Sequence, residues 1–271
     1  MNLYRKYEGQ SGYTAIAGGD GSSLKLLELG YLKLSKDQTF EMKTGDSELV
    51  IVMMTGICAV RGEGFSFGPV GGRRDVFAGP AHSVYIPVDT AFEVTCLENM
   101  EAAFCYGKAD RKLAAFEVKP SEVPVNELGI LNLKRGLHSL IDERLETCSL
   151  CIGEAYTYPG NWASYPPHKH DVSELPFEAV MEEIYFFKFN LPSGFGFQAV
   201  YTEDGSLDEV YRVGHNTAVE VPRGYHPFAC APGYSNYMLY LMAGEKRSFY
   251  RRTQPCHQWI EAAERMVRYN L

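Results

Sequence analysis

Short apolar segments separated by turn residues run through the whole chain, and this pattern limits the fold more strongly than any other feature. The segments that we expect to be strands are residues 31–34, 49–54, 83–86, 91–97, 102–106, 149–156, 183–189, 195–202, 217–221 and 237–242. Many short strands with glycine, proline and Asp-Gly turns between them are typical of a sandwich or a barrel. Residues 258–269 have apolar side chains at helical spacing. The sequence therefore predicts an all-β protein with a short C-terminal helix.

The chain also resembles itself at an offset of 135 residues, about half its length. Residues 79–87 align on 214–222 without a gap, and residues 48–52 align on 183–187. Two matches at one offset indicate duplicated domains. Residues 118–124 are polar and contain two prolines, which favours a linker there. We therefore expect two tandem barrels, residues 1–123 and 124–271. Two segments after the linker, 126–133 and 134–141, are compatible with either helix or strand.

Composition argues against several classes of partner. The net charge is −8, which disfavours binding to nucleic acid or to an anionic membrane. The first ten residues lack the apolar core of a secretory signal, and the longest apolar stretch, 49–60, is too short to span a bilayer. Seven cysteines without a framework spacing suggest free thiols in a reducing compartment. We expect a cytoplasmic protein in which Cys148 and Cys151 are core thiols rather than a zinc or redox pair.

Two histidines one residue apart, followed by an acidic strand and a later histidine, suggest a metal site. In a strand, His168 and His170 point to the same face. Glu183 lies in an otherwise apolar strand, where an unpaired charge would be costly. With His226 in a later glycine-proline turn, these four side chains would form a three-histidine, one-carboxylate shell with open coordination positions. An HxH pair alone is more often a surface or hydrogen-bonded pair, and the prediction depends on all four residues.

These residues lie within longer strings that resemble one family. The strings are residues 160–171, 182–185, 196–202, 221–227 and 242–244. They are similar to the bicupin sugar-acid isomerases, the family that contains 5-deoxy-glucuronate isomerase and 4-deoxy-L-threo-5-hexosulose-uronate ketol-isomerase. Cupins are small jelly-roll barrels that hold a metal inside. The resemblance is strong over residues 155–260 and loose in the first half, and residues 134–145 depart from it.

The resemblance implies a metal-dependent aldose–ketose isomerase of a deoxy uronic acid. The reaction expected first is the conversion of 5-deoxy-glucuronate to 2-deoxy-5-keto-gluconate in inositol catabolism. The ligands carry over to His168, His170, Glu183 and His226, which would hold one divalent metal, zinc or manganese first. The neighbouring Glu182 points the other way by strand alternation. Glu174 and Glu178 on the loop before it are competing ligands that we expect to be solvated. A homo-oligomer is also expected, because cupins often pair.

Four further residues are candidates for contact with the substrate. They are Tyr185, Gln198, Arg223 and Tyr225. Tyr185 shares a strand face with Glu183, Gln198 lies on the next strand, and Arg223 and Tyr225 adjoin His226. Arg223 could supply the cation that a substrate carboxylate needs, or it could lie on a solvated turn. Each tyrosine could instead be a core aromatic, and the sequence does not identify the base that moves the proton.

Two other classes of function remain open, because a metal shell does not select the chemistry. One is a different metal-cupin enzyme, such as an iron-dependent dioxygenase, and the other is a bicupin that binds a sugar without turning it over. Within the first half, the offset of 135 puts Lys33, Ser35, Glu48 and Ala91 at the ligand positions. We therefore expect no metal in the first barrel, with Glu48 at the strand start near solvent or paired locally, for example with Lys33.

Overall fold

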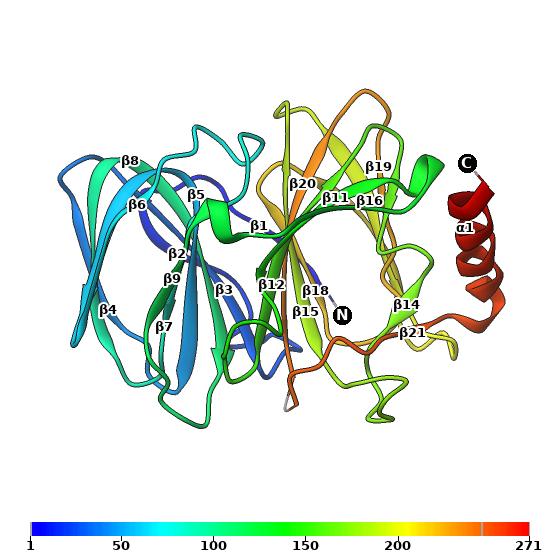
Figure 1. Cartoon of the computed structure of the whole chain (residues 1–271), viewed down its shortest axis with the longest axis horizontal. Coiled ribbons are helices and arrows are strands. Elements are labelled where there is room, and N and C mark those ends of the chain that lie inside the picture. Colours follow the sequence, from blue (N-terminus) through cyan, green and yellow to red (C-terminus); the bar gives the residue numbers. More distant parts are fainter. Residues whose placement is uncertain (1, 245, 271) are drawn as a thin grey trace.

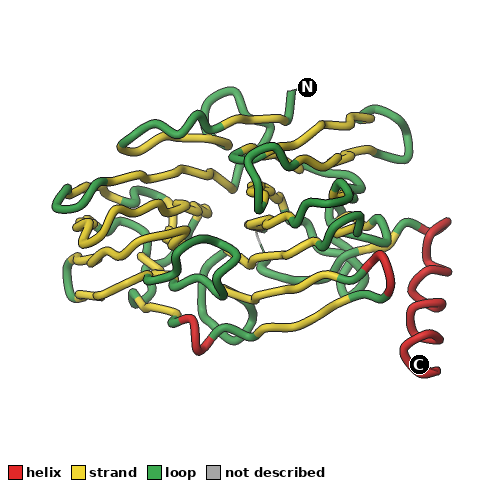
Figure 2. The backbone as a smooth tube through the Cα atoms, turned by 90° about the horizontal axis from the view of Figure 1, so that it is seen from above, coloured by secondary structure: helices red, strands yellow, loops and turns green. Residues whose placement is uncertain are grey.

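The computed structural model describes residues 2–244 and 246–270. Two β-structures lie side by side along the long axis of the molecule, the first half of the chain on the left of Figure 1 and the second on the right. Helix α1 (Gln258–Asn270) stands at the far end of the second half, and Figure 2 also shows it beside the strands. The predicted fold class, two tandem barrels of β-strands followed by a short helix, is confirmed.

The first half is one eight-stranded sheet in which long bent strands serve as the frame. Its strands are β2 (Gly12–Ala17), β3 (Leu27–Leu34), β4 (Thr39–Lys43), β5 (Ser47–Gly62), β6 (Phe65–Gly71), β7 (Ser83–Ile86), β8 (Ala91–Lys108) and β9 (Phe116–Val118). β5 pairs with β8 through several register shifts, which bend both strands. Gly56 lies in this bend with φ of 78°, and a Cβ there would be 2.2 Å from the carbonyl oxygen of Asn99. The bend therefore requires glycine.

The second half contains a seven-stranded, a four-stranded and a two-stranded sheet, in the orders β1-β18-β15-β20-β12-β11-β10, β13-β19-β16-β17 and β14-β21. The strands are β1 (Tyr4–Lys6), β10 (Val125–Leu128), β11 (Arg135–Ile141), β12 (Leu150–Thr157), β13 (Trp162–Ala163), β14 (His168–Lys169), β15 (Glu182–Phe189), β16 (Phe195–Tyr201), β17 (Asp208–Gly214), β18 (Thr217–Val221), β19 (Phe228–Cys230), β20 (Asn236–Ala243) and β21 (Arg252–Thr253). Three short 3-10 helices complete the structure: η1 (Pro120–Glu122), η2 (Leu131–Leu133) and η3 (Pro255–His257). Of the two ambiguous segments, 134–141 is thus mainly strand, whereas 126–133 contains the end of β10 and the 3-10 helix η2.

The chain crosses between the two halves twice. β9 belongs to the sheet of the first half, η1 follows, and β10 belongs to the sheet of the second half. The predicted linker therefore lies between strands of different sheets. β1, however, pairs with β18 in the second half. The first residues of the chain therefore extend the sheet that carries the candidate site.

Three apolar clusters stabilise this arrangement. One fills the first barrel, one fills the second, and the third lies between the two halves. The third contains side chains from both, among them Tyr31, Val50, Tyr85, Ile184, Phe186 and Leu239. Alternate residues of β15 thus face either this contact or the interior of the second barrel. Burial on both faces explains why the sequence of β15 is apolar almost throughout.

The internal repeat is real as a strand order, but its offset is not uniform. The aligned stretches form equivalent strand pairs, β5 with β7 and β15 with β18. In the first half, Leu49 of β5 pairs with Ile86 of β7. A uniform offset of 135 would therefore place Ile184 opposite Val221 in the second half. Instead, Ile184 pairs with Glu220. The structural counterpart of Glu183 is therefore Leu49, which points into the first barrel.

Glu48 does not lie where the sequence predicted. Its side chain is fully buried between the halves. It accepts hydrogen bonds of 2.7–2.8 Å from the backbone N–H groups of residues 148–150 and one of 2.9 Å from the hydroxyl of Tyr85. The expectation that Glu48 lies near solvent or pairs with Lys33 is wrong, since Lys33 pairs with Glu101. Because the repeat is displaced by one residue, the side chain of Glu48 points out of the first barrel.

Candidate functional site

The candidate metal ligands come from separate elements of the second barrel. His168 lies on β14, and His170 follows directly after that strand. Glu183 lies near the start of β15, with Tyr185 two residues on and on the same face. His226 lies in the turn between β18 and β19. The hydrogen bond from the Met181 N–H to the carbonyl of His170 holds the loop between β14 and β15 together at its ends.

Three of these side chains converge closely. The Nε2 atom of His170 lies 3.1 Å from Oε2 of Glu183, and Nε2 of His226 lies 3.3 Å from the same oxygen. His170, Glu183 and His226 offer ligand atoms within 4.8 Å of one another. The ring of His168 lies beside them, with its centroid 5.0 Å from that of His226. All four predicted ligands therefore gather at one place, and His168 is the outer member.

Backbone carbonyls orient the three imidazoles in the same way. The acceptors of the Nδ1 atoms are the carbonyl oxygens of Pro166 (3.0 Å) for His168, Met181 (2.6 Å) for His170 and Gly224 (2.8 Å) for His226. Because a carbonyl only accepts, we assign the proton of each neutral ring to Nδ1. Each Nε2 then carries a lone pair that is available to a metal, the arrangement that outer hydrogen bonds produce at metal-binding histidines.

The lone pairs facing Glu183 make this a site that fits a cation. Nε2 of His226 is buried and has no hydrogen-bond donor among the described residues. The carboxylate oxygen of Glu183 that lies 3.3 Å from it is also an acceptor. Two buried acceptors at 3.3 Å repel each other unless a positive charge lies near both. The donor set of imidazole nitrogens and one carboxylate suits a divalent transition metal.

The protonation of His168 and His226 agrees with this arrangement, whereas His170 is shifted in the opposite direction. Burial lowers the pKa of His226 to about 4. Burial, with a smaller contribution from the charge of Arg251, holds the pKa of His168 well below its usual value. Burial also acts against protonation of His170, but the hydrogen bond and charge of Glu183 outweigh it and raise that pKa. His168 and His226 are therefore neutral at physiological pH, as ligands must be.

A cavity of about 520 Å³ opens onto these residues. His168, His170, Glu183 and Tyr185 line it, together with side chains of β10, β11 and the segment 249–251. Cavities of this size commonly bind small metabolites. The hydroxyl of Tyr185 lies 2.7 Å from Oγ of Ser164. Burial, followed by the charge of Glu183, raises the pKa of Tyr185 well above its usual value, so this phenol stays protonated.

Of the four predicted substrate-contact residues, Tyr185 alone lines the cavity. Gln198 is fully buried and donates hydrogen bonds to backbone carbonyls, including that of His226 at 2.7 Å. Tyr225 is buried and donates to Glu203 at 2.9 Å. These two residues therefore contact the turn that carries His226.

Arg223 lies elsewhere. It is exposed, and it donates a hydrogen bond of 3.1 Å to Oγ of Ser206. It lines a different cavity of about 770 Å³, bordered by Lys25 and Glu182. The local alternation of a strand does not apply to a turn residue, which explains why the sequence did not determine its direction.

Several cavity residues were not found by sequence reasoning. They include Arg135, Ser164, Tyr240 and Arg251. Arg251 lies in the run of aromatic and basic residues at 249–252, directly before β21. This run is visible in the sequence, but nothing in it indicates that the run lines a cavity together with residues much earlier in the chain. Only the pairing of β21 with β14 brings it beside His168.

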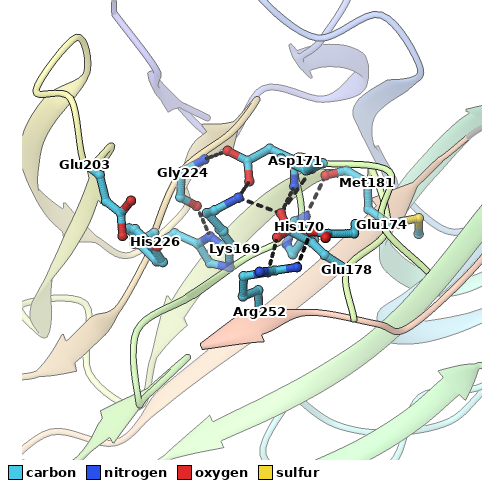
Figure 3. A network of polar contacts seen from close by, with 12 residues as sticks. Lys169, His170, Asp171, Glu174, Glu178, Met181, Glu203, Gly224, His226 and Arg252 are labelled. Carbon is cyan, nitrogen blue, oxygen red and sulfur yellow. Dashed lines mark hydrogen bonds and ion pairs between the residues drawn. The ribbon is translucent and has the colours of Figure 1, made fainter. Parts of the chain in front are cut away.

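A second polar network holds the loop that follows His170 (Figure 3). Glu178 is its centre, and its carboxylate accepts from the N–H groups of residues 171 and 172 and lies 2.7 Å from Nζ of Lys169. Arg252 approaches the other oxygen of Glu178 at 3.0 Å and also pairs with Glu174. The expectation that Glu178 is solvated is wrong, since its side chain is 1% exposed; the charges of Lys169 and Arg252 compensate its burial.

Comparison with known proteins agrees with these observations. The profile of the KduI/IolB family matches residues 3–260. The chain belongs to the KduI/IolB family. It is similar to the 5-deoxy-glucuronate isomerase of Geobacillus thermodenitrificans, with 39% identity over 228 residues that cover 84% of this chain and 83% of that protein. It is also similar to the 5-deoxy-glucuronate isomerase of Bacillus subtilis, with 37% identity over 241 residues, 88% of this chain and 89% of that protein.

Solved structures agree on the fold of this KduI/IolB family member. An IolB-like protein from Salmonella typhimurium superposes with a TM-score of 0.92 at 32% identity, covering 96% of this chain and all of that one. The oxalate decarboxylase of Lactobacillus farciminis superposes with a TM-score of 0.66 at 12% identity, covering 100% of this chain and 94% of that one, which shows the shared bicupin fold alone. Among the described residues, no helix is long and apolar enough to cross a membrane.

Proposed function

We propose that this protein is a metal-dependent aldose–ketose isomerase that converts 5-deoxy-glucuronate to 2-deoxy-5-keto-gluconate in inositol catabolism. The convergence of His170, Glu183 and His226, two of which line a cavity of about 520 Å³, carries the proposal. The family and the names of the relatives support the choice of substrate.

We assign one divalent metal, zinc or manganese first, to His168, His170, Glu183 and His226. When bound, such a metal polarises a carbonyl and stabilises the negative charge that develops when the adjacent C–H loses its proton. The protein's own contribution is to hold the ligands in place. Side chains of His170, Glu183 and His226 are at most 5% exposed, and the low local dielectric that results strengthens electrostatic interactions with the substrate.

Tyr185 is our candidate for direct contact with the reacting part of the substrate. Its hydroxyl lies at the cavity beside Glu183 and is held by Ser164. Because its pKa is raised, Tyr185 acts as a hydrogen-bond donor to a substrate oxygen rather than as a base. A donor aimed at the oxygen that becomes negative would favour the enediolate-like transition state.

Gln198 and Tyr225 act indirectly in this proposal. Gln198 donates to the carbonyls of His226 and of the following Pro227, and Tyr225 is fixed by Glu203. Both stabilise the turn that presents His226, so they are positioning residues. Loss of either would alter metal affinity before it altered the chemistry.

The first barrel has no metal in this proposal. At the position that matches Glu183, it carries Leu49, which lies in the apolar interior. An aliphatic side chain offers no ligand atom, and the nearby carboxylate of Glu48 is directed toward residues 148–150. Metal analysis should therefore give one ion per chain, all of it in the second half.

An isomerase assay on 5-deoxy-glucuronate, run before and after complete chelation, tests the proposal. Activity should need neither NAD nor oxygen, should disappear on chelation and should return when metal is added. Oxygen consumption by the iron-loaded protein would instead favour a dioxygenase, and tight sugar-acid binding without turnover would favour a binding protein. Isomerase activity that survives metal removal would reject the mechanism.

A further inference from the structure

We propose that Arg251 binds the carboxylate of the sugar-acid substrate. This inference rests on the proposed function for its substrate class, and it assigns to the site a cationic residue that lies outside the metal shell. The argument depends on where Arg251 lies, on how its segment is held, and on the partners of the other cations nearby.

The segment that carries Arg251 is anchored on both sides. Before it, Arg247 donates to backbone carbonyls of residues 142, 145 and 150. In its middle, the N–H of Ala179 donates to the carbonyl of Tyr250 at 3.0 Å. After it, β21 pairs with β14, placing Thr253 opposite His168. The backbone at Arg251 is therefore fixed two residues from the strand partner of a proposed metal ligand.

Arg251 lines the same cavity as His168 and Tyr185. Thr253, two residues after Arg251, is the strand partner of His168, so Arg251 and His168 line neighbouring parts of one cavity. One small molecule in this cavity can therefore contact both Arg251 and the site residues. A uronic acid carries its carboxylate and its reacting carbonyl on one short chain, and such a molecule fits a cavity of about 520 Å³.

The other arginines that line this cavity already have partners. Arg144 donates to both carboxylate oxygens of Asp142, at 2.8 and 2.9 Å. Arg135 donates to the carbonyl of Leu133 at 2.9 Å. By contrast, among residues 2–244 and 246–270, which the structure describes, the side chain of Arg251 has no hydrogen-bond or ion-pair partner. Its planar set of donors is available to a ligand.

Two other positively charged side chains near the site, Lys169 and Arg252, also have ion-pair partners. Lys169 pairs with Asp171 and Glu178, each at 2.7 Å (Figure 3). Arg252 pairs with Glu174 and Glu178. A guanidinium that has no partner among the described side chains and that lines a cavity is suited to bind a carboxylate with two parallel hydrogen bonds.

Direct binding to the metal-loaded protein, measured by titration calorimetry, separates this role from catalysis. The probes are D-glucuronate, which has the carboxylate, and D-glucose, which lacks it. Arg251→Ala should weaken glucuronate binding about 10- to 100-fold, the usual effect of losing a hydrogen bond to a charged group, and should leave glucose binding unchanged. The affinity of Arg251→Lys for glucuronate should lie between those of wild type and Arg251→Ala, because lysine keeps the positive charge but lacks the planar pair of donors of a guanidinium. Arg61→Ala, at an exposed arginine of β5 in the other half, is the matched control and should behave as wild type.

Kinetics and metal content complete the test. Arg251→Ala should raise the KM for 5-deoxy-glucuronate by a similar factor, with a smaller change in kcat and full metal content. Glucuronate binding within about twofold of wild type would overturn the proposal, as would an equal loss for glucose, a loss of metal, or a larger effect from Arg223→Ala. A wild-type protein that prefers glucuronate through Arg251 but does not isomerise 5-deoxy-glucuronate would reject the proposed function and keep the carboxylate site.

Discussion

Replacing Glu48 with alanine tests the internal organisation of the chain and the location of the metal in a single variant. If the carboxylate joins the two halves as the structure indicates, Glu48→Ala will lower the free energy of unfolding and leave the metal content at one ion per chain. If Glu48 were instead a metal ligand of the first barrel, the same change would remove an ion.

The expected loss follows from the hydrogen bonds that Glu48 accepts. Three successive N–H groups, at residues 148–150, donate to it at 2.7–2.8 Å, and its side chain is fully buried. A buried donor left without an acceptor costs about 1–3 kcal/mol. Taking the low end for each amide gives about 3 kcal/mol. For a chain of this size, that loss lowers Tm by roughly 6–12 °C.

Thermal unfolding followed by circular dichroism, together with metal analysis, measures both outcomes. Glu48→Gln keeps one carbonyl oxygen as an acceptor and should show a smaller loss than alanine. Glu41→Ala, at an exposed position on β4, is the matched control and should leave Tm within about 2 °C of wild type. A Glu48→Ala protein with an unchanged Tm would refute the reasoning about the contact between the halves.

Three further predictions concern the site and the acid stability of the contact between the halves. His226→Ala should lose most of its metal in an elemental analysis, since it removes a buried donor; full occupancy would contradict the ligand set. Tyr185→Phe should lower kcat about 100-fold with unchanged metal content, and wild-type kinetics would show that its hydroxyl contacts only Ser164. Burial favours the neutral form of Glu154, but the charge of Arg73, together with the hydrogen bonds from His138 and Arg73, outweighs it and lowers the pKa of Glu154 below 4.5. This carboxylate therefore stabilises the fold fully above pH 4.5 and loses its contribution as the pH falls through the folded-state pKa. Glu154→Gln should accordingly start from a lower Tm and decline less steeply with acid, and parallel curves in a pH series would argue against this carboxylate as a source of acid sensitivity.

Local pattern was sufficient for much of the fold. Each of the ten expected strand segments contains observed strand, and residues 83–86 and 217–221 match β7 and β18 at both ends. These segments are apolar and bounded by turns, so a nearby signal determines them. β8 was expected as two strands, because the polar residues 98–99 between the apolar segments resemble a turn. In the structure the strand continues through them, since Glu98 pairs with Ile57 of β5 and Met100 pairs with Leu34 of β3, contacts that the local sequence does not indicate.

Local sequence likewise predicted some residues of the candidate site and not others. The sequence indicated His168, His170, Glu183 and His226, and the structure brings their side chains together. Alternation within one strand also placed Tyr185 on the face of Glu183. It did not determine the directions of Arg223 and Tyr225, because both lie in a turn, where the period of a strand does not hold. Arg251 was not predicted, since its position depends on β21 pairing with β14, more than eighty residues earlier in the chain.

By itself, the sequence determined the strand-rich architecture, the duplication and the four residues that gather at the second barrel, because strand alternation and turn chemistry act over a few residues. Only the tertiary structure determined which side chains of each half point into its barrel and which point to the contact between the halves. A one-residue difference in register places Leu49 inside the first barrel and directs Glu48 to the contact between the halves, and a side-chain period of two makes such a shift reverse every residue of a strand. The cavity and the place of Arg251 in it were likewise decided by long-range pairing, since hydrogen bonds between distant strands bring together residues that no local pattern connects.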